Sequence, residues 1–513
     1  MPLVTSSHRS QLMMLSLEEK IESDNIVRVV DAFVTSVDPQ ILGFIIKGKK
    51  HEGRPAYAAT TLIKLYIYGY LNSVRSSRKL RTEAKRNVEL WWLLDNQTPS
   101  YKTISNFRKD NPEAFKNLFV HFRNFCLTLG LYGKTTIAID GSKFRAQNSK
   151  KNNYNVKKIQ QHLDYIEAQT ADYIKQLDDN DNIESDKKIQ DLKLRKAKYE
   201  KLQEQLDNTE QLQISTTDSD ARALPLKMSI VEVAYNNQIA VDDKHCLIAD
   251  FEITNVADSE SLHSLSKTTK DAFGIKEKET LTTLADKGYY KGSEIKKCQD
   301  DFIDTLVAIR KSPNKNKAPE VRKDKFAYNK SNDNYTCPTG NILKSEGTYS
   351  RKLRGKVQNK FTRYIADHRD CVSCPLYKLC VSPTRQTREK GKQIDRSEYE
   401  DARTINDENI AVRKNEYRRR QAIVEHPFGT IKRQFGYTYT LMKGLQNVNT
   451  EFSIIHLCYN LKRVAQILGI KQLLEALFDA FRLLWQHSTI WYISCLNPTS
   501  YYTKRYTSSC YYS

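Results

Sequence analysis

Two short apolar segments of the sequence each end on an aspartate, with a glycine close behind. They are residues 135–141 (TTIAIDG), which contain Asp140, and residues 281–288 (LTTLADKG), which contain Asp286. β-Branched and apolar residues of this kind favour buried strands. A strand inside a sheet cannot solvate a charge, so both acids are expected at carboxyl ends of strands, where open α/β sheets bind ligands. The alternative is an aspartate that only shapes a turn before glycine.

A third acid, Glu425, lies in a predicted basic helix. Arg418, Glu425 and Lys432 are each seven residues apart, so they share one face if the helix is continuous. Pro427 would kink this helix or mark its first turn. Three converging carboxylates need cations to stay ionised, and hard oxygen ligands select Mg²⁺ or Mn²⁺. Two such ions activate a nucleophile and stabilise the leaving oxygen of a phosphodiester.

The composition is consistent with a nucleic-acid partner. The chain has 513 residues, with 82 Lys and Arg against 61 Asp and Glu, which gives a net charge of +21. Its length predicts two or three domains, and its charge suits a polyanion, although a merely soluble basic protein is the alternative. Ten cysteines in so long a chain, with no signal segment, favour a reducing cytosol. The most apolar late stretch, 476–496, carries Asp479 and Arg482, so no membrane contact is expected.

The first 130 residues are predicted to be helical. Helices are expected around 62–69, over 76–94 and 102–110, and from Pro112 onward. Short basic helices joined by turns with Pro and Ser are typical of a helix-turn-helix arrangement. An ordinary helical bundle with a solvated basic face is the alternative.

After the first aspartate, apolar residues keep a heptad-like spacing over 159–177 and again over 189–206. This pattern predicts an inserted helical hairpin that serves as a packing or dimerisation arm. Strands at 235–241 and 246–254 and a further strand at 305–309 complete a sheet. Asp250 and Asp258, near these strands, are interpreted as structural.

Four cysteines lie in a polar, basic segment, 310–414, that shows no strong periodicity. They are Cys337, Cys371, Cys374 and Cys380. A structural Zn²⁺ takes four such ligands, and it would supply folding energy to a segment that builds no core of its own. Free cysteines are the alternative, and His368 is a substitute ligand.

The order of the three acids resembles that of acid-triad (DDE) transposases of bacterial insertion sequences, in particular the insertion sequence 1182 group. The motifs that carry the resemblance are residues 138–141 (AIDG), 284–289 (LADKGY), 424–432 (VEHPFGTIK), 53–57 (GRPAY), 76–78 (SSR) and 107–108 (FR). Gln421 stands where the family's third motif expects an arginine, and Arg420 lies one residue farther from Glu425.

The resemblance implies an α/β fold with a ribonuclease H-like catalytic core. The helical DNA-binding domain, helix-turn-helix-like, would span 1–130, and the catalytic domain 131–470. The latter would carry the helical hairpin at 156–213 and the cysteine-bearing insertion at 311–414. Residues 471–513 would form a tail.

The resemblance also implies roles for single residues. Asp140 would bridge two Mg²⁺ or Mn²⁺ ions, and Asp286 and Glu425 would each hold one. Lys432 and Arg420 would contact DNA phosphates near the cut.

The activity implied is a transposase that cuts the ends of its element and joins the 3′-hydroxyls to target DNA. Its partner is double-stranded DNA, which Arg78 and Arg108 of the helical leader would also contact. A homodimer on DNA, acting at the nucleoid in a bacterial cytoplasm, is expected. A nuclease that cuts without joining is one alternative, and a catalytically silent DNA-binding protein is the other.

Overall fold

A computed structural model gives the fold. It describes residues 10, 14, 16–46, 55–179, 183–208, 213–225, 231–256, 258–309, 318–353 and 356–489. The chain forms two compact units, each built from separate stretches. One unit comprises Met1–Leu129, Phe144–Ala234 and Phe428–Ser513, and the other comprises Gly130–Lys143 and Tyr235–Pro427.

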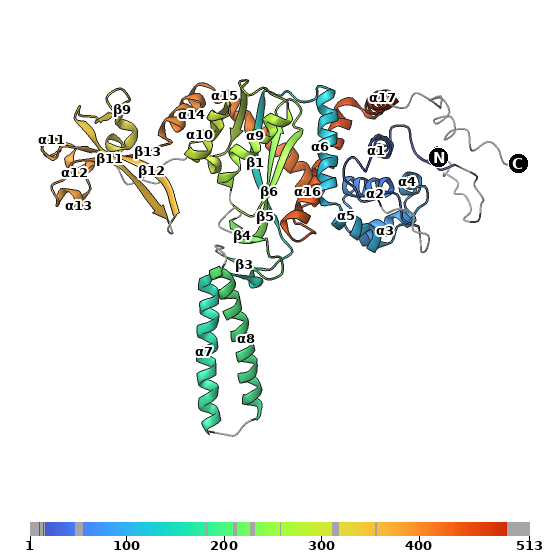
Figure 1. Ribbon diagram of the computed structural model, residues 1–513, viewed down its shortest axis with the longest axis horizontal. Helices are drawn as coiled ribbons and strands as arrows, with labels where there is room; N and C mark the ends of the chain where they lie inside the picture. The colour runs from blue at the N-terminus through green and yellow to red at the C-terminus, as the bar shows by residue number, and fades with distance from the viewer. Residues whose placement is uncertain are drawn as a thin grey trace, which may run out of the picture. The chain divides into compact units, whose positions relative to one another are not determined.

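The first unit is mainly helical (Figure 1). Its N-terminal helices are α1 (Ile26–Thr35), α2 (Ala59–Leu71), α3 (Ser77–Arg86), α4 (Val88–Leu93), α5 (Tyr101–Asp110) and α6 (Pro112–Thr128). The single helix predicted over 76–94 is wrong, because Asn87 has an extended backbone and its side chain caps α4 by accepting the N–H of Glu89. An asparagine at this position satisfies an amide that an uninterrupted helix would bond internally.

Two C-terminal helices complete the core of this unit. They are α16 (Leu445–Leu468), which packs on α2 and α6, and α17 (Ile470–Thr489), which packs on α1. A buried ion pair of 2.7 Å joins Arg75, after α2, to Glu451 of α16. The beginning of the predicted tail is therefore a packed helix, while residues 490–513 lie outside the described part of the chain.

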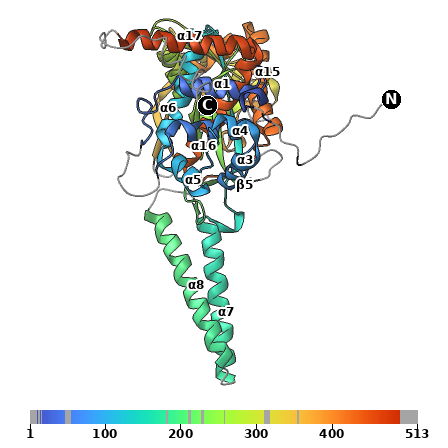
Figure 2. The same ribbon diagram turned by 90° about the vertical axis from the view of Figure 1, so that its right-hand side faces the viewer.

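The hairpin predicted from heptad spacing is present as α7 (Val156–Asp179) and α8 (Ile183–Asn208) (Figures 1 and 2). Its seam is a row of buried side chains at the predicted positions: Ile159, Leu163, Ile166, Leu192, Tyr199, Leu202 and Leu206. A short antiparallel pair, β2 (Asn153–Tyr154) and β3 (Ile214–Ser215), closes its base.

The main sheet has six strands. They are β1 (Thr136–Arg145), β4 (Arg222–Pro225), β5 (Val231–Asp242), β6 (Ile248–Thr254), β7 (Leu281–Ala285) and β8 (Ile303–Val307). The order is β4-β5-β1-β7-β8, with β6 also paired to β5. β1, β7 and β8 run parallel, whereas β4 and β6 are antiparallel to β5.

Helices cover this sheet in the second unit. α9 (Leu262–Ala272) packs on β6 and β7, while α10 (Gly292–Asp300) and α14 (Glu400–Val412) pack on β8. The side chain of Asn406 on α14 exchanges two hydrogen bonds of 2.9 Å with the backbone of Val307. A helix thereby satisfies the backbone groups of a strand at the edge of the sheet. α15 (Lys414–Gly429) follows at once and carries Pro427 within it.

The cysteine-bearing segment forms a second, five-stranded antiparallel sheet. Its strands are β9 (Ala327–Asn329), β10 (Asn334–Thr336), β11 (Ile342–Leu353), β12 (Lys356–Ala366) and β13 (Gln393–Ser397), and its short helices are α11 (His368–Val372), α12 (Tyr377–Cys380) and α13 (Pro383–Gln386). The expectation that this segment builds no core is wrong. Phe326, Tyr335, Leu343, Tyr364 and Ile394 pack together in a small apolar cluster.

None of the described helices combines the length and the apolar character that crossing a bilayer requires.

Candidate functional site

Asp140 and Asp286 lie side by side at one edge of the parallel part of the main sheet. The pairing of β1 with β7 ends at Ile139 and Ala285, and each acid is the next residue of its chain segment. The prediction that the first strand stops at its aspartate is wrong, because β1 continues to Arg145. Since the pairing with β7 stops at Ile139, Asp140 still faces the open edge that the sequence predicted.

Backbone amides fix both carboxylates. Oδ1 of Asp140 accepts the N–H of Gly141 at 2.9 Å. Oδ1 of Asp286 accepts the N–H of Gly288 at 3.0 Å and so caps the helical turn Lys287–Tyr289. Gly141 and Gly288, which follow the two acids in the sequence, therefore each donate a backbone N–H to the nearby carboxylate.

The pKa of Asp140 is raised to about 6, mainly by burial and to a smaller extent by the nearby carboxylates of Asp286 and Asp258. The guanidinium of Arg420 and the amide of Gly141 lower it. Asp140 is thus a carboxylate that has lost much of its water and whose charge is only partly compensated.

Arg420 supplies the positive charge that faces Asp140. Its Nη1 lies 3.7 Å from Oδ2 of Asp140, and only 15% of its side chain is exposed. No hydrogen-bond partner of that nitrogen was found among the described residues. In this structure Arg420 forms an ion pair with the first acid, and the DNA contact that the resemblance implied for it stays a prediction.

The position of Arg420 follows from how α15 attaches to the sheet. Arg413, just before α15, pairs with Asp304 of β8 and donates to Thr282 of β7 at 3.0 Å. Within α15, Arg419 pairs with Asp243 at 3.0 Å. These contacts fix the first turns of α15, and as a result the side chain of Arg420 is directed at the ends of the β1 and β7 pairing.

Glu425 lies one and a half turns farther along α15 and is exposed. Its Oε1 accepts a hydrogen bond of 2.7 Å from Gln421, the residue that replaces the expected arginine. Within the described residues no hydrogen bond or ion pair joins Glu425 to Asp140 or Asp286. The convergence of all three acids on two ions stays a prediction.

The remaining basic residues named from the sequence occupy different environments. Lys432 lies in a π-helical turn, Thr430–Gln434, so the face predicted for a continuous α-helix is not kept. Arg78 is exposed on α3 and lies over the ring of Tyr101.

Arg108 is 7% exposed, and its Nη1 donates to the hydroxyl of Tyr70 at 2.7 Å. In this structure the side chain belongs to the helical core, and its contact with DNA stays a prediction.

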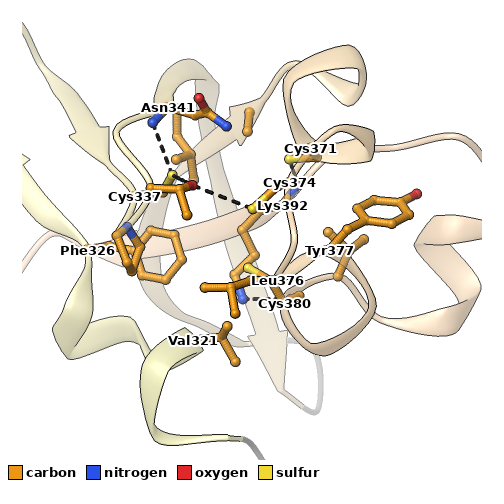
Figure 3. A pocket seen from close by; sticks show the side chains of 15 residues that line it. Val321, Phe326, Cys337, Asn341, Cys371, Cys374, Leu376, Tyr377, Cys380 and Lys392 are labelled. Atoms are coloured by element: carbon orange, nitrogen blue, oxygen red, sulfur yellow. Dashed lines mark hydrogen bonds between the residues drawn. The ribbon is translucent and has the colours of Figure 1, made fainter.

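The four cysteines named from the sequence line one cavity of about 30 Å³ in the small sheet (Figure 3). The Sγ of Cys337 accepts the N–H of Asn341 at 3.1 Å, and the Sγ of Cys371 accepts the N–H of Lys392 at 3.4 Å. Burial raises the pKa of the Cys371 and Cys380 thiols. His368, the substitute ligand, is not among the residues that line this cavity.

Among the residues that the structure describes, no three His, Cys, Asp or Glu side chains are arranged to hold a metal ion. The donor types nevertheless fit. Asp140 and Asp286 offer hard oxygens at a place where Arg420 only partly compensates their negative charge, which suits Mg²⁺ or Mn²⁺, and four thiols around one cavity suit Zn²⁺.

Two family models match the chain. Residues 15–110 match a model described as "Transposase domain (DUF772)", and residues 336–465 match one described as "Transposase DDE domain". These matches indicate a DNA transposase and support a transposase of the DDE class. The second match includes Glu425 and the four clustered cysteines, whereas Asp140 and Asp286 lie outside it.

Among solved structures, the chain is similar to one titled "Cryo-EM structure of piggyBac transposase synaptic complex with hairpin DNA (SNHP)". The identity is 9%, with 95% of this chain and 85% of that chain covered, and the TM-score is 0.31. No curated protein matches the sequence.

Replacing Asp140 by Asn tests the electrostatics of the site without metal or DNA. The pKa of Asp140 rises from 3.8 to about 6 on folding, so the parent loses stability as the pH rises through this range. In EDTA, the stability of Asp140→Asn relative to the parent should therefore increase by about 2–3 kcal/mol between pH 4 and pH 7.

Urea denaturation at several pH values measures this difference. The control is Asp324→Asn, at an exposed position of the same unit, whose difference from the parent should stay constant. A pH-independent difference for Asp140→Asn would show that folding does not disfavour the charged form of Asp140.

Proposed function

We propose that this chain is a Mg²⁺-dependent DDE transposase of a bacterial insertion sequence, of the insertion sequence 1182 group. It would cleave the ends of its element and join the 3′-hydroxyls to target DNA. The observation that carries the proposal is the adjacent placement of Asp140 and Asp286 on parallel strands, opposite Arg420, in a chain that matches two transposase models.

A ribonuclease H-like core is part of this proposal. Its support is the strand arrangement, in which an antiparallel pair, β6 and β5, adjoins β1 and the parallel strands β7 and β8. The two acids then belong to the central strand and to its parallel neighbour, at the edge where α/β sheets bind ligands.

The chemistry assigns roles to the chain's own residues. Asp140 would hold both ions, and Asp286 and Glu425 would hold one each. Bound there, Mg²⁺ or Mn²⁺ would lower the pKa of an attacking water or 3′-hydroxyl and stabilise the leaving oxygen. Glu425 would exchange its hydrogen bond with Gln421 for this role.

Arg420 and Lys432 would contact phosphates near the cut, as the resemblance implies. The guanidinium of Arg420 suits this role because it is always charged and offers several donors. It already lies 3.7 Å from the central carboxylate, which would direct it toward a phosphate bound at the same edge.

Binding of double-stranded DNA would rest on the overall charge of +21, with Arg78 on the helical domain of residues 1–130 as one contact. The domain of residues 131–470 would be catalytic, and α7 and α8 would form an arm for a homodimer on DNA. Action at the nucleoid in a bacterial cytoplasm belongs to the same proposal.

Replacing Asp286 by Asn tests the function directly. Asparagine keeps the shape and loses the charge, so cleavage of terminal-repeat DNA in Mg²⁺ should fall by about a thousandfold or more. Binding of the same DNA in a gel-shift assay should persist, because the Lys and Arg residues are unchanged. Asp271→Asn, on the exposed side of α9, is the control and should cut like the parent.

Three results would decide among the functions considered. Cutting without joining under every condition would favour a nuclease. Binding without cutting by the unmodified chain would favour a silent DNA-binding protein. Undiminished cutting by Asp286→Asn would refute the assigned acids.

We propose in addition that the cavity lined by Cys337, Cys371, Cys374 and Cys380 holds one structural Zn²⁺. Support comes from the four thiols around a single cavity and from the backbone N–H groups that donate to two of the sulfurs. Such donors stabilise thiolates, which are the form that binds zinc.

Elemental analysis of protein purified in reductant should find about one zinc per chain. Cys374→Ser should lower this content strongly, whereas Cys246→Ser, at a cysteine outside the cavity, should not. Protein without zinc, or zinc content that Cys374→Ser leaves unchanged, would contradict the assignment.

A further inference from the structure

A hydrogen-bonded network lies directly beside the two adjacent aspartates. Its centre is Asp258, in the helical turn after β6, and its other members are Lys143, Asn236, Gln238 and Tyr289. All five residues belong to the second unit, and we call them the Asp258 network.

The oxygens of Asp258 are nearly saturated with donors. Lys143 donates to Oδ1 and Oδ2 at 3.0 and 2.9 Å, and Oδ1 also accepts from Asn236 at 2.8 Å and Gln238 at 2.7 Å. The hydroxyl of Tyr289 donates to the free oxygen of Gln238. With its charge balanced by Lys143 and three donors on one oxygen, Asp258 is poorly suited to bind a metal ion itself.

The network fills the space next to the two chain segments that follow Asp140 and Asp286. A Cβ atom added to Gly141, the residue after Asp140, would lie 2.4 Å from Nε2 of Gln238 and 2.5 Å from Oδ1 of Asp258. A Cβ at Gly288, which bonds to Asp286, would lie 3.6 Å from the other oxygen of Asp258. One carboxylate thus touches the turn of each strand-end acid.

Burying so many polar side chains costs free energy of folding, which suggests that the cluster is kept for a functional reason. Asn236 and Gln238 are adjacent on one face of β5 and are 0% exposed, and Tyr289 is 1% exposed. Apolar residues would fill the same space without the cost of burying amides and a hydroxyl. Apart from Oδ1 of Asn236, for which no partner is present among the described residues, the polar atoms of the network are linked by hydrogen bonds, and such buried networks fix a unique local geometry.

We propose that Asp258 is a positioning residue, which with Tyr289 sets the spacing between Asp140 and Asp286 for divalent metal binding. The inference rests on the proposed function, because it assigns the metal to those two acids. Asp258 acts through the turns that carry them, as the residues behind metal ligands do in other metal sites.

Titration with Mn²⁺ alone, followed by the electron paramagnetic resonance signal of the free ion, tests this without DNA or turnover. Asp258→Asn should raise the Kd for Mn²⁺ at the acidic site about tenfold. Tyr289→Phe keeps every charge and removes only one hydroxyl, and it should raise the Kd by at least about threefold. Asp250→Asn, on β6 and outside the network, is the matched control and should bind like the parent.

The melting temperature without metal provides a second readout. A purely structural network would change this temperature and leave the Kd of the folded variants unaltered, which would overturn the inference. If Asp258→Asn does not fold, Tyr289→Phe alone decides.

Other results separate the inference from the function on which it rests. Mn²⁺ bound by the parent and lost in Asp140→Asn, with Tyr289→Phe unchanged, would overturn the positioning role and leave the proposed function standing. Loss of all binding in Asp258→Asn would make Asp258 a ligand and also refute positioning. A parent that binds no Mn²⁺ sensitive to Asp140→Asn would remove the proposed function itself.

Discussion

The parallel pairing of β1 with β7 is the constraint on which the site depends. Its last paired residues, Ile139 and Ala285, are followed on both strands by a carboxylate, so two negative charges are held next to each other in a partly dehydrated place. Burial and this neighbour raise the pKa of Asp140, which means that the folded chain carries an electrostatic cost there. A bound cation would relieve the repulsion between the two carboxylates, and this favours binding of a divalent metal ion at this place.

Other residues of the second unit offset the electrostatic repulsion between Asp140 and Asp286. α15 attaches through Arg413 and Arg419 to acids of the sheet, which directs the guanidinium of Arg420 to Asp140. The charge of Asp258 is neutralised by Lys143, and its Oδ1 accepts hydrogen bonds from the buried amides of Asn236 and Gln238. Arg420 supplies positive charge, and the Asp258 network holds the turns that carry Asp140 and Asp286. Together they allow the two acids to lie next to each other in the folded chain.

Much of this architecture was predictable from local patterns. Apolar periodicity identified the hairpin of α7 and α8, and the run of β-branched residues identified the edge with Asp140 and Asp286. Long-range contacts were not predictable. The burial of Arg108 depends on Tyr70, and the ion pair of Arg420 depends on how α15 attaches to β7 and β8. The core of the cysteine-bearing sheet was not predictable, because each strand contributes only one or two buried apolar residues and so shows no periodic pattern.

Anomalous diffraction at the manganese edge, from crystals of the full chain with Mn²⁺ and duplex DNA of its element's end, would locate metal at this edge of the sheet. We expect manganese in contact with the carboxylates of both Asp140 and Asp286, with Arg420 displaced from its ion pair. Crystals with bound DNA and Mn²⁺ in which this edge of the sheet holds no manganese, and in which Asp140 remains paired with Arg420, would contradict it.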